Sequence, residues 1–157
     1  MSNFIYGKLT TNDITQLFDS KIDFFMIEYA VQNNFAVHFS NISVHKKNSG
    51  NMFFAISDNF FVNYCEYFLE PIIYTADGTP LLENLCKDLE KLYGLIKKMF
   101  EFGFVKEIEL KFSYVEVDED EYDTCMTSIE NFKDTIIQKY KSTIGFPVIR
   151  VIVKKKV

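Results

Sequence analysis

Several residue types that build common active sites are scarce in this chain. Its 157 residues include no tryptophan, two histidines and a single arginine, Arg150. Arginine is the usual residue for gripping phosphate or carboxylate through paired hydrogen bonds, so we expect no site built on arginine clamps. His38 and His45 would lie about 23 Å apart on one extended strand, too far to share a metal ion or a proton relay. Ser-His-Asp and Cys-His chemistry therefore lacks its usual base, and there is no G-x-S-x-G motif.

Glycine and cysteine are also few and scattered. None of the six glycines lies within five residues of another, whereas loops that cradle phosphate need clustered glycines. The three cysteines, Cys65, Cys86 and Cys125, are an odd number without a C-x-x-C pair. We therefore expect no nucleotide-binding fingerprint, no disulfide framework and no zinc ribbon, but buried free thiols in a reducing compartment. The sequence predicts no cofactor and no metal.

Long apolar runs and an excess of positive charge are missing as well. No stretch of about 18 consecutive apolar residues is present, and the N-terminus does not show a basic region followed by an apolar one. The formal net charge of −5 argues against direct binding to nucleic acid. These features predict a cytoplasmic protein with no membrane segment.

What the chain does have is a large apolar content. Hydrophobic residues make up 48% of it, with 17 Phe and 9 Tyr, so it can bury a substantial core. The length, without a Pro/Gly/Ser-rich interruption, predicts one domain over residues 1–157.

Hydrophobic spacing in the first half predicts strands around helices. A strand over 3–9 precedes a helix capped by Thr11 or Asn12, and the stretch 22–31 fits a helix better than the alternative, a strand. Residues 35–44 alternate with a change of phase that a bulge near Ser40 and Asn41 would absorb, keeping Phe35, Val37, Phe39, Ile42 and Val44 on one face. A turn at 46–51 leads to a returning strand at 52–57, and residues 60–69 have helical spacing.

The second half continues this alternation. Thr79 and Pro80 begin a helix that runs past Met99 and stops at Gly103, and 105–114 is a strand with one wet face. The next helix is predicted from the spacing of Tyr122, Met126, Ile129, Ile136 and Tyr140, and 146–153 is an inner strand. The order predicts an α+β fold: a mixed, mostly antiparallel sheet packed against three to four helices.

One charged segment rises above this background. Residues 116–123 carry six carboxylates and no basic residue: Glu116, Asp118, Glu119, Asp120, Glu121 and Asp123. Without this segment the charge sum is 17 − 16 = +1, so the net negative charge of the chain is local. The segment is predicted to lie between a strand and a helix.

Three interpretations of the acidic segment compete. Its carboxylates could complement the positive end of the following helix. The spacing of Asp118 and Asp120 fits the start of a calcium loop, but Asp123 stands at the required glycine and Ile129 at the bidentate glutamate, so this motif fails. The third interpretation is a docking surface for a basic protein, which clustered carboxylates steer by electrostatic attraction.

Two other segments have both a structural and a functional interpretation. The basic tail, 154–157, together with Arg150, is most simply a solubilising end that protects a sheet edge, with anion binding as the alternative. Residues 29–45 contain no Asp, Glu, Lys or Arg, which fits either an ordinary half-buried hairpin or a neutral contact surface.

These features favour a non-catalytic protein-binding domain. Small acidic intracellular domains without catalytic motifs include inhibitors of nuclease toxins, and nucleases keep cationic clefts that carboxylates can occupy. We therefore expect an immunity-type inhibitor whose six acidic residues bind a basic partner such as a nuclease toxin domain. The first alternative is a small-ligand or regulatory module with an aromatic-lined pocket. The second is an enzyme that uses paired carboxylates, such as Glu107 and Glu109. The oligomeric state stays open.

Overall fold

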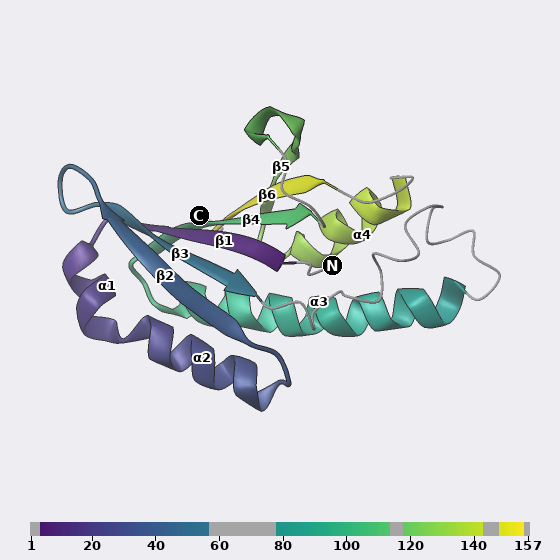
Figure 1. Cartoon of the computed structure of the whole chain (residues 1–157), viewed down its shortest axis with the longest axis horizontal. Helices are drawn as coiled ribbons and strands as arrows, with labels where there is room; N and C mark the ends of the chain where they lie inside the picture. The colour runs from purple at the N-terminus through teal and green to yellow at the C-terminus, as the bar shows by residue number, and fades with distance from the viewer. Residues whose placement is uncertain (1–3, 57–77, 114–117, 143–147, 156–157) are drawn as a thin grey trace.

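The chain forms one mixed six-stranded sheet with helices packed against it (Figure 1). The computed structural model describes residues 4–56, 78–113, 118–142 and 148–155. The strand order is β2-β3-β1-β4-β6-β5, with β1 (Phe4–Thr11), β2 (Val37–Val44), β3 (Gly50–Ile56), β4 (Val105–Ser113), β5 (Asp123–Ser128) and β6 (Ile149–Lys154). The helices are α1 (Ile14–Ser20), α2 (Ile22–Gln32), α3 (Gly78–Glu101) and α4 (Phe132–Ser142). All neighbouring strands are antiparallel except β5 and β6, so the predicted α+β class is confirmed.

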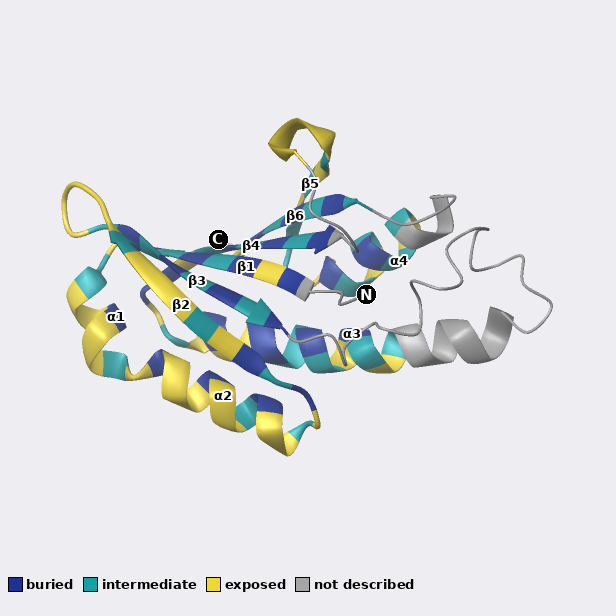
Figure 2. Ribbon diagram, viewed as in Figure 1, coloured by how far each residue is buried: buried dark blue, intermediate teal, exposed yellow. Residues whose placement is uncertain are grey.

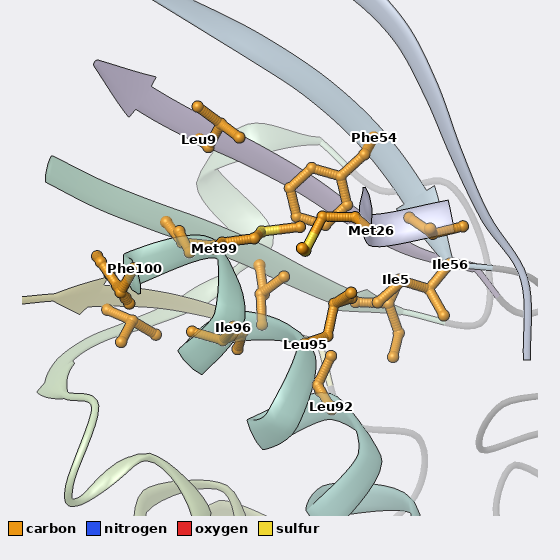
Figure 3. Packing of buried hydrophobic residues seen from close by; sticks show 14 of the residues in the cluster. Ile5, Leu9, Met26, Phe54, Ile56, Leu92, Leu95, Ile96, Met99 and Phe100 are labelled. Carbon is orange, nitrogen blue, oxygen red and sulfur yellow. The ribbon is translucent and has the colours of Figure 1, made fainter. Parts of the chain in front are cut away.

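The two faces of the sheet differ sharply. In β3, Met52, Phe54 and Ile56 are buried, whereas the alternate residues Asn51, Phe53 and Ala55 are half-buried. Helices α1, α2 and α3 lie on the first side of the sheet (Figure 1), and α3 packs Leu92, Leu95, Ile96 and Met99 toward Phe54 and Ile5 (Figure 3). We call the other side the open face, because no described helix covers it.

The first helical segment is broken in the middle. Asp13 caps α1 by accepting a hydrogen bond from the Gln16 amide, at 3.1 Å, so the cap lies one residue beyond the predicted Asn12. Lys21 then adopts a left-handed conformation, with φ of 55°, which ends α1 and turns the chain into α2. Residues 22–32 are helical, as predicted in preference to a strand.

The hairpin of β2 and β3 has the expected bulge. Its register shifts between Phe39 and Ile42, where the change of phase predicted it. Ile42 pairs with the buried Met52, so the bulge does return the strand to the covered face. However, β2 is an edge strand, and Ile42 and Val44 are exposed rather than buried as expected. Within the uncharged segment 29–45, residues 37–44 thus form one edge of the sheet.

The prediction of a helix that starts near Tyr122 is wrong. Residues 123–128 form β5 instead, which pairs in parallel with β6, and Met126 is exposed. The helix α4 begins only at Phe132, which is fully buried, and it connects the two parallel strands. The threonines at 124 and 127 favour a strand, and the parallel pairing with β6 outweighs the helical spacing of Tyr122, Met126 and Ile129. The acidic segment therefore lies between two strands and not between a strand and a helix.

The remaining elements follow the sequence closely. Helix α3 ends at Glu101, two residues before Gly103, and β4 alternates buried Ile108, Leu110 and Phe112 with residues of the open face. The last strand, β6, is an inner strand between β4 and β5, as predicted. The helix expected over 60–69 lies outside the described residues. Cys86 and Cys125 are free thiols, and Cys65 lies outside the described residues.

Candidate functional site

The acidic segment folds into a turn held above the open face. Residues 119–121 form a single 3-10 turn, η3, and Asp118 precedes it in an extended conformation. Figure 1 shows η3 projecting from the β5 end of the sheet, on the side opposite α1, α2 and α3. We call residues 118–121 the acidic turn. Glu116, the first predicted site residue, lies outside the described residues.

Glu119 fixes the acidic turn to the sheet. Lys111 of β4 and Arg150 of β6 are paired in register, and both side chains lie on the open face. Nζ of Lys111 donates a hydrogen bond to Oε1 of Glu119 at 2.5 Å, and Nη2 of Arg150 binds Oε2 of the same carboxylate. Nη2 of Arg150 also donates to the Glu119 carbonyl oxygen, at 3.3 Å. One carboxylate therefore bridges two adjacent strands.

The Tyr122 ring packs against the same two basic side chains. Cζ of Arg150 lies 5.3 Å and Nζ of Lys111 lies 5.5 Å from its ring centroid, within the range of cation–π attraction. Nη1 of Arg150 further donates to Oγ1 of Thr124 at 3.5 Å. The chain's single arginine thus holds the start of β5 and the acidic turn together.

The same arginine continues a row of ion pairs across the sheet. Its Nε lies 3.1 Å from Oε1 of Glu109, whose Oε2 lies 3.3 Å from Nζ of Lys8 on β1. Among the described residues, no hydrogen bond from that Nε accompanies the ion pair. The Glu109 and Arg150 side chains are only 15% and 18% exposed, so their attraction is less screened by solvent than that of a surface pair. This row orients Arg150 before it meets Glu119.

The five predicted carboxylates that the structure describes therefore divide into two groups. Glu119 is bound by Lys111 and Arg150, and Asp123 accepts a hydrogen bond from Lys139 of α4 at 2.7 Å, which raises the pKa of Lys139. Asp118, Asp120 and Glu121 are exposed, and no ion pair reaches them from the described part of the chain. The acidic turn thus presents three exposed carboxylates, while Glu119 attaches the turn to the sheet and Asp123 attaches β5 to α4.

Sequence reasoning missed the basic half of this arrangement. The sequence places Arg150 with the solubilising basic tail and predicts no arginine clamp, but in the structure Arg150 clamps a carboxylate of its own chain. Lys154 and Lys155 are exposed as predicted, while Nζ of Lys155 also donates to the Phe100 carbonyl oxygen at 3.1 Å. The alternation of Glu107, Glu109 and Lys111 was the available signal, since it placed Lys111 on the wet face beside an inner strand.

Two further candidates can be located. Glu107 and Glu109, the proposed carboxylate pair, both form ion pairs. Glu109 pairs with Arg150 and Lys8, and Oε1 of Glu107 lies 3.8 Å from Nζ of Lys154. A groove between α2 and α3 is lined by Phe25, Met26, Tyr29 and Phe102, with Glu28, Gln32, Lys98 and Glu101 around them.

Within the described ranges, three or more potential metal ligands do not cluster anywhere, and no helix has both the length and the apolarity to cross a membrane.

The anchor of the acidic turn should respond to pH. The hydrogen bond from Lys111 is the main cause that holds the pKa of Glu119 below its ordinary value, and the charges of Lys111, Arg150 and Lys8 add to it. Because the pKa is lowered in the folded state, this anchoring stabilises the fold above the ordinary glutamate pKa of about 4.3. The contribution is lost as the pH falls through the lower pKa of the folded state.

We expect Lys111→Met to raise the pKa of Glu119 toward its ordinary value. The measurement is an NMR titration of the Glu119 side-chain carboxyl carbon in the wild type and the variant. Lys106→Met, which removes an exposed lysine of the same strand, is the matched control and should leave the Glu119 pKa unchanged. An equal Glu119 pKa in the wild type and Lys111→Met would contradict the anchor.

The comparisons with known proteins give no relative. No protein-family model, no curated protein and no solved structure matches the chain.

Proposed function

We propose that this protein is a non-catalytic binding domain that uses its acidic turn to neutralise a basic protein partner inside the cell. The observation that carries the proposal is that one carboxylate of the acidic turn is bound to the sheet while the other three are exposed. Glu119 is bound to two strands, while Asp118, Asp120 and Glu121 stay exposed and free of ion pairs from the described residues.

The anchoring lowers the cost of binding a partner. An exposed loop that becomes ordered on binding loses conformational entropy, which weakens the complex. Here Glu119 is fixed on both oxygens, and Tyr122 on the other side of the turn packs on the same two basic side chains. The three exposed carboxylates are therefore presented by a turn whose backbone is already held in place.

The charges of the turn favour a cationic partner. Asp118, Asp120 and Glu121 lie within four residues, so they repel one another, and a basic partner would relieve this repulsion. Complementary charge also raises the rate of association, and it does so more strongly at low ionic strength. A nuclease domain fits this chemistry, because its substrate cleft carries the positive charge that phosphates require. An inhibitor of such a toxin is the most specific form of the proposal.

The test is affinity capture from a lysate of the source cells at low and moderate salt. We expect the wild type to retain a basic protein, and the triple variant Asp118→Lys, Asp120→Lys, Glu121→Lys to lose it. The control variant Asp19→Lys, Glu130→Lys, Asp134→Lys makes the same change in net charge at exposed carboxylates elsewhere and should retain the partner. Equal retention by the two triple variants would reject the acidic turn as the binding site.

A functional measurement then separates a toxin inhibitor from another kind of binding protein. The captured protein, purified alone, is assayed for nuclease activity with increasing amounts of the wild type. We expect complete inhibition at a one-to-one ratio and none with the acidic-turn triple variant. A captured protein without nuclease activity would keep the binding function but reject the toxin.

A small-ligand function is the second candidate. Its support is the groove between α2 and α3, where Phe25, Tyr29 and Phe102 provide aromatic surface. Spectral changes of Tyr29 on addition of a ligand would favour it. The acidic turn would have no part in that function.

A further inference from the structure

Helix α2 is apolar on two opposite sides. One side buries Ile22, Met26 and Ala30 against the rest of the fold. The other side exposes Phe24, Ile27 and Val31, which are 60%, 42% and 67% accessible. A helix that is apolar all around is normally covered all around, so the outer side of α2 lacks a covering element in the described structure. Figure 2 shows this exposed side along α2.

The exposed residues form one stripe. Phe24, Ile27 and Val31 follow the spacing i, i+3, i+7, which places them on one face of the helix. Phe25 does not belong to the stripe, because it points about 100° around the helix from Phe24 and lines the groove toward α3. Its ring centroid lies 5.8 Å from that of Phe24 and 6.2 Å from that of Phe102. Phe18 of α1, 57% exposed, adds a further aromatic side chain on the preceding helix. Isolated exposed apolar residues are common, but a continuous stripe marks a contact surface.

We propose that this stripe binds the same stripe of a second copy of the chain, so that two α2 helices pack antiparallel around a two-fold axis close to Ile27. Phe24 and Val31 lie at nearly equal distances on either side of that axis. The two-fold operation therefore places Phe24 of each copy against Val31 of the other, which is the self-complementarity that an isologous interface requires. The stripe is long enough for about two helical turns of contact.

The exposed area supports a dimer. If a phenylalanine side chain has about 200 Å² to bury, the 57% and 60% exposure of Phe18 and Phe24 gives roughly 230 Å² per copy. Two copies would bury roughly 460 Å² through these residues alone, about three tenths of a standard interface of about 1,600 Å². Ile27, Val31 and the polar residues around the stripe supply further area. A small apolar centre with a polar rim is the usual composition of such interfaces.

The charges of α2 argue against a membrane as the covering surface. The helix itself carries Asp23 and Glu28 and no basic residue. Helices that lie on anionic lipid surfaces are rich in lysine and arginine. In the proposed dimer, Glu28 lies next to Ile27, so the two Glu28 carboxylates approach each other near the axis. Their repulsion limits the affinity of the dimer, so removing the Glu28 charge should strengthen dimerisation.

Sedimentation equilibrium of the full chain measures the dimer directly. We expect the wild type, at tens of micromolar, to have twice the monomer mass of 18.4 kDa. The double variant Phe24→Ser, Val31→Ser is expected to weaken dimerisation by about a hundredfold or more. Glu28→Gln is expected to strengthen it several-fold. Because all three side chains are exposed, the circular dichroism spectra of the variants should match that of the wild type.

A control and a cross-link locate the interface. Met126→Ser removes an equally exposed apolar side chain from the open face and should leave the dimer intact. Ile27→Cys lies closest to its own symmetry mate and should form an intermolecular disulfide on oxidation, whereas Lys47→Cys in the β2–β3 turn should not. A wild type that stays monomeric at about 100 µM overturns the proposal. A monomer that binds lipid vesicles overturns it as well. A dimer that the Phe24→Ser, Val31→Ser variant leaves unchanged overturns it too.

Discussion

Replacing Phe132 with alanine is expected to lower the free energy of unfolding by about 3–5 kcal/mol. Phe132 is the first residue of α4 and is fully buried in the core cluster that includes residues of α3 and β6. Its ring fills the space where α4 meets the rest of the fold, and alanine would leave a cavity that rigid strands cannot close. Urea unfolding followed by circular dichroism provides the measurement.

A second substitution on the same helix calibrates this result. Ile137 is only partly buried against the core, so Ile137→Ala should cost clearly less than Phe132→Ala. Equal costs for the two variants would show that α4 does not depend on the Phe132 ring. Because α4 connects β5 to β6, Phe132→Ala should also loosen β5, visible as faster amide exchange at residues 123–128.

Gly7→Val is expected to destabilise the protein by about 3 kcal/mol or more. Gly7 lies in β1, paired with Phe54 on one side and Leu110 on the other. A Cβ atom at position 7 would lie within 2.6 Å of three atoms of the Phe54 ring. Phe54 is 2% exposed and surrounded by core residues, so its ring cannot move aside at low cost. The same urea unfolding measures the loss.

The clash can be separated from other effects of valine by a double-mutant cycle. Phe54→Ala alone should cost about 3–5 kcal/mol, because it empties the space under β1. In the double variant Gly7→Val, Phe54→Ala, the valine enters that space, so the combined loss should be well below the sum of the two single losses. An additive result would mean that the Phe54 ring is not what excludes a side chain at position 7.

Much of the fold could be predicted because local pattern and final structure agree. The alternation in β4 reflects side chains that face one continuous core. The start of α3 near Thr79 and Pro80 reflects a local backbone preference, and the bulge in β2 returns that strand to the covered face. The strand β5 could not be found this way, because an exposed parallel edge strand has little hydrophobic periodicity. Its position depends on hydrogen bonds to β6, which is distant in sequence.

The candidate site was predictable in one half only. A run of carboxylates is visible in any sequence, and the exposure of Asp118, Asp120 and Glu121 agrees with a wet surface. The role of Glu119 depends on Lys111 and Arg150, which become neighbours only when β4 and β6 pair. Whether a charge in such a run is free or bound is decided by strand order, and strand order follows from the packing of the whole core.

The strand order also sets the sequence in which the sheet can assemble. The hairpin of β2 and β3 joins segments close in the chain, and β1 can pair with β3 as soon as both are made. The other edge of β1 waits for β4, whose partners lie far along the chain, as in the pairing of Ile5 with Phe112. Closing such a long loop is slow, so we expect folding on a timescale of milliseconds to seconds. During synthesis, the three-stranded β2-β3-β1 unit exposes the unpaired edge of β1 until β4 emerges, which makes that edge the point where a nascent chain is most prone to aggregate.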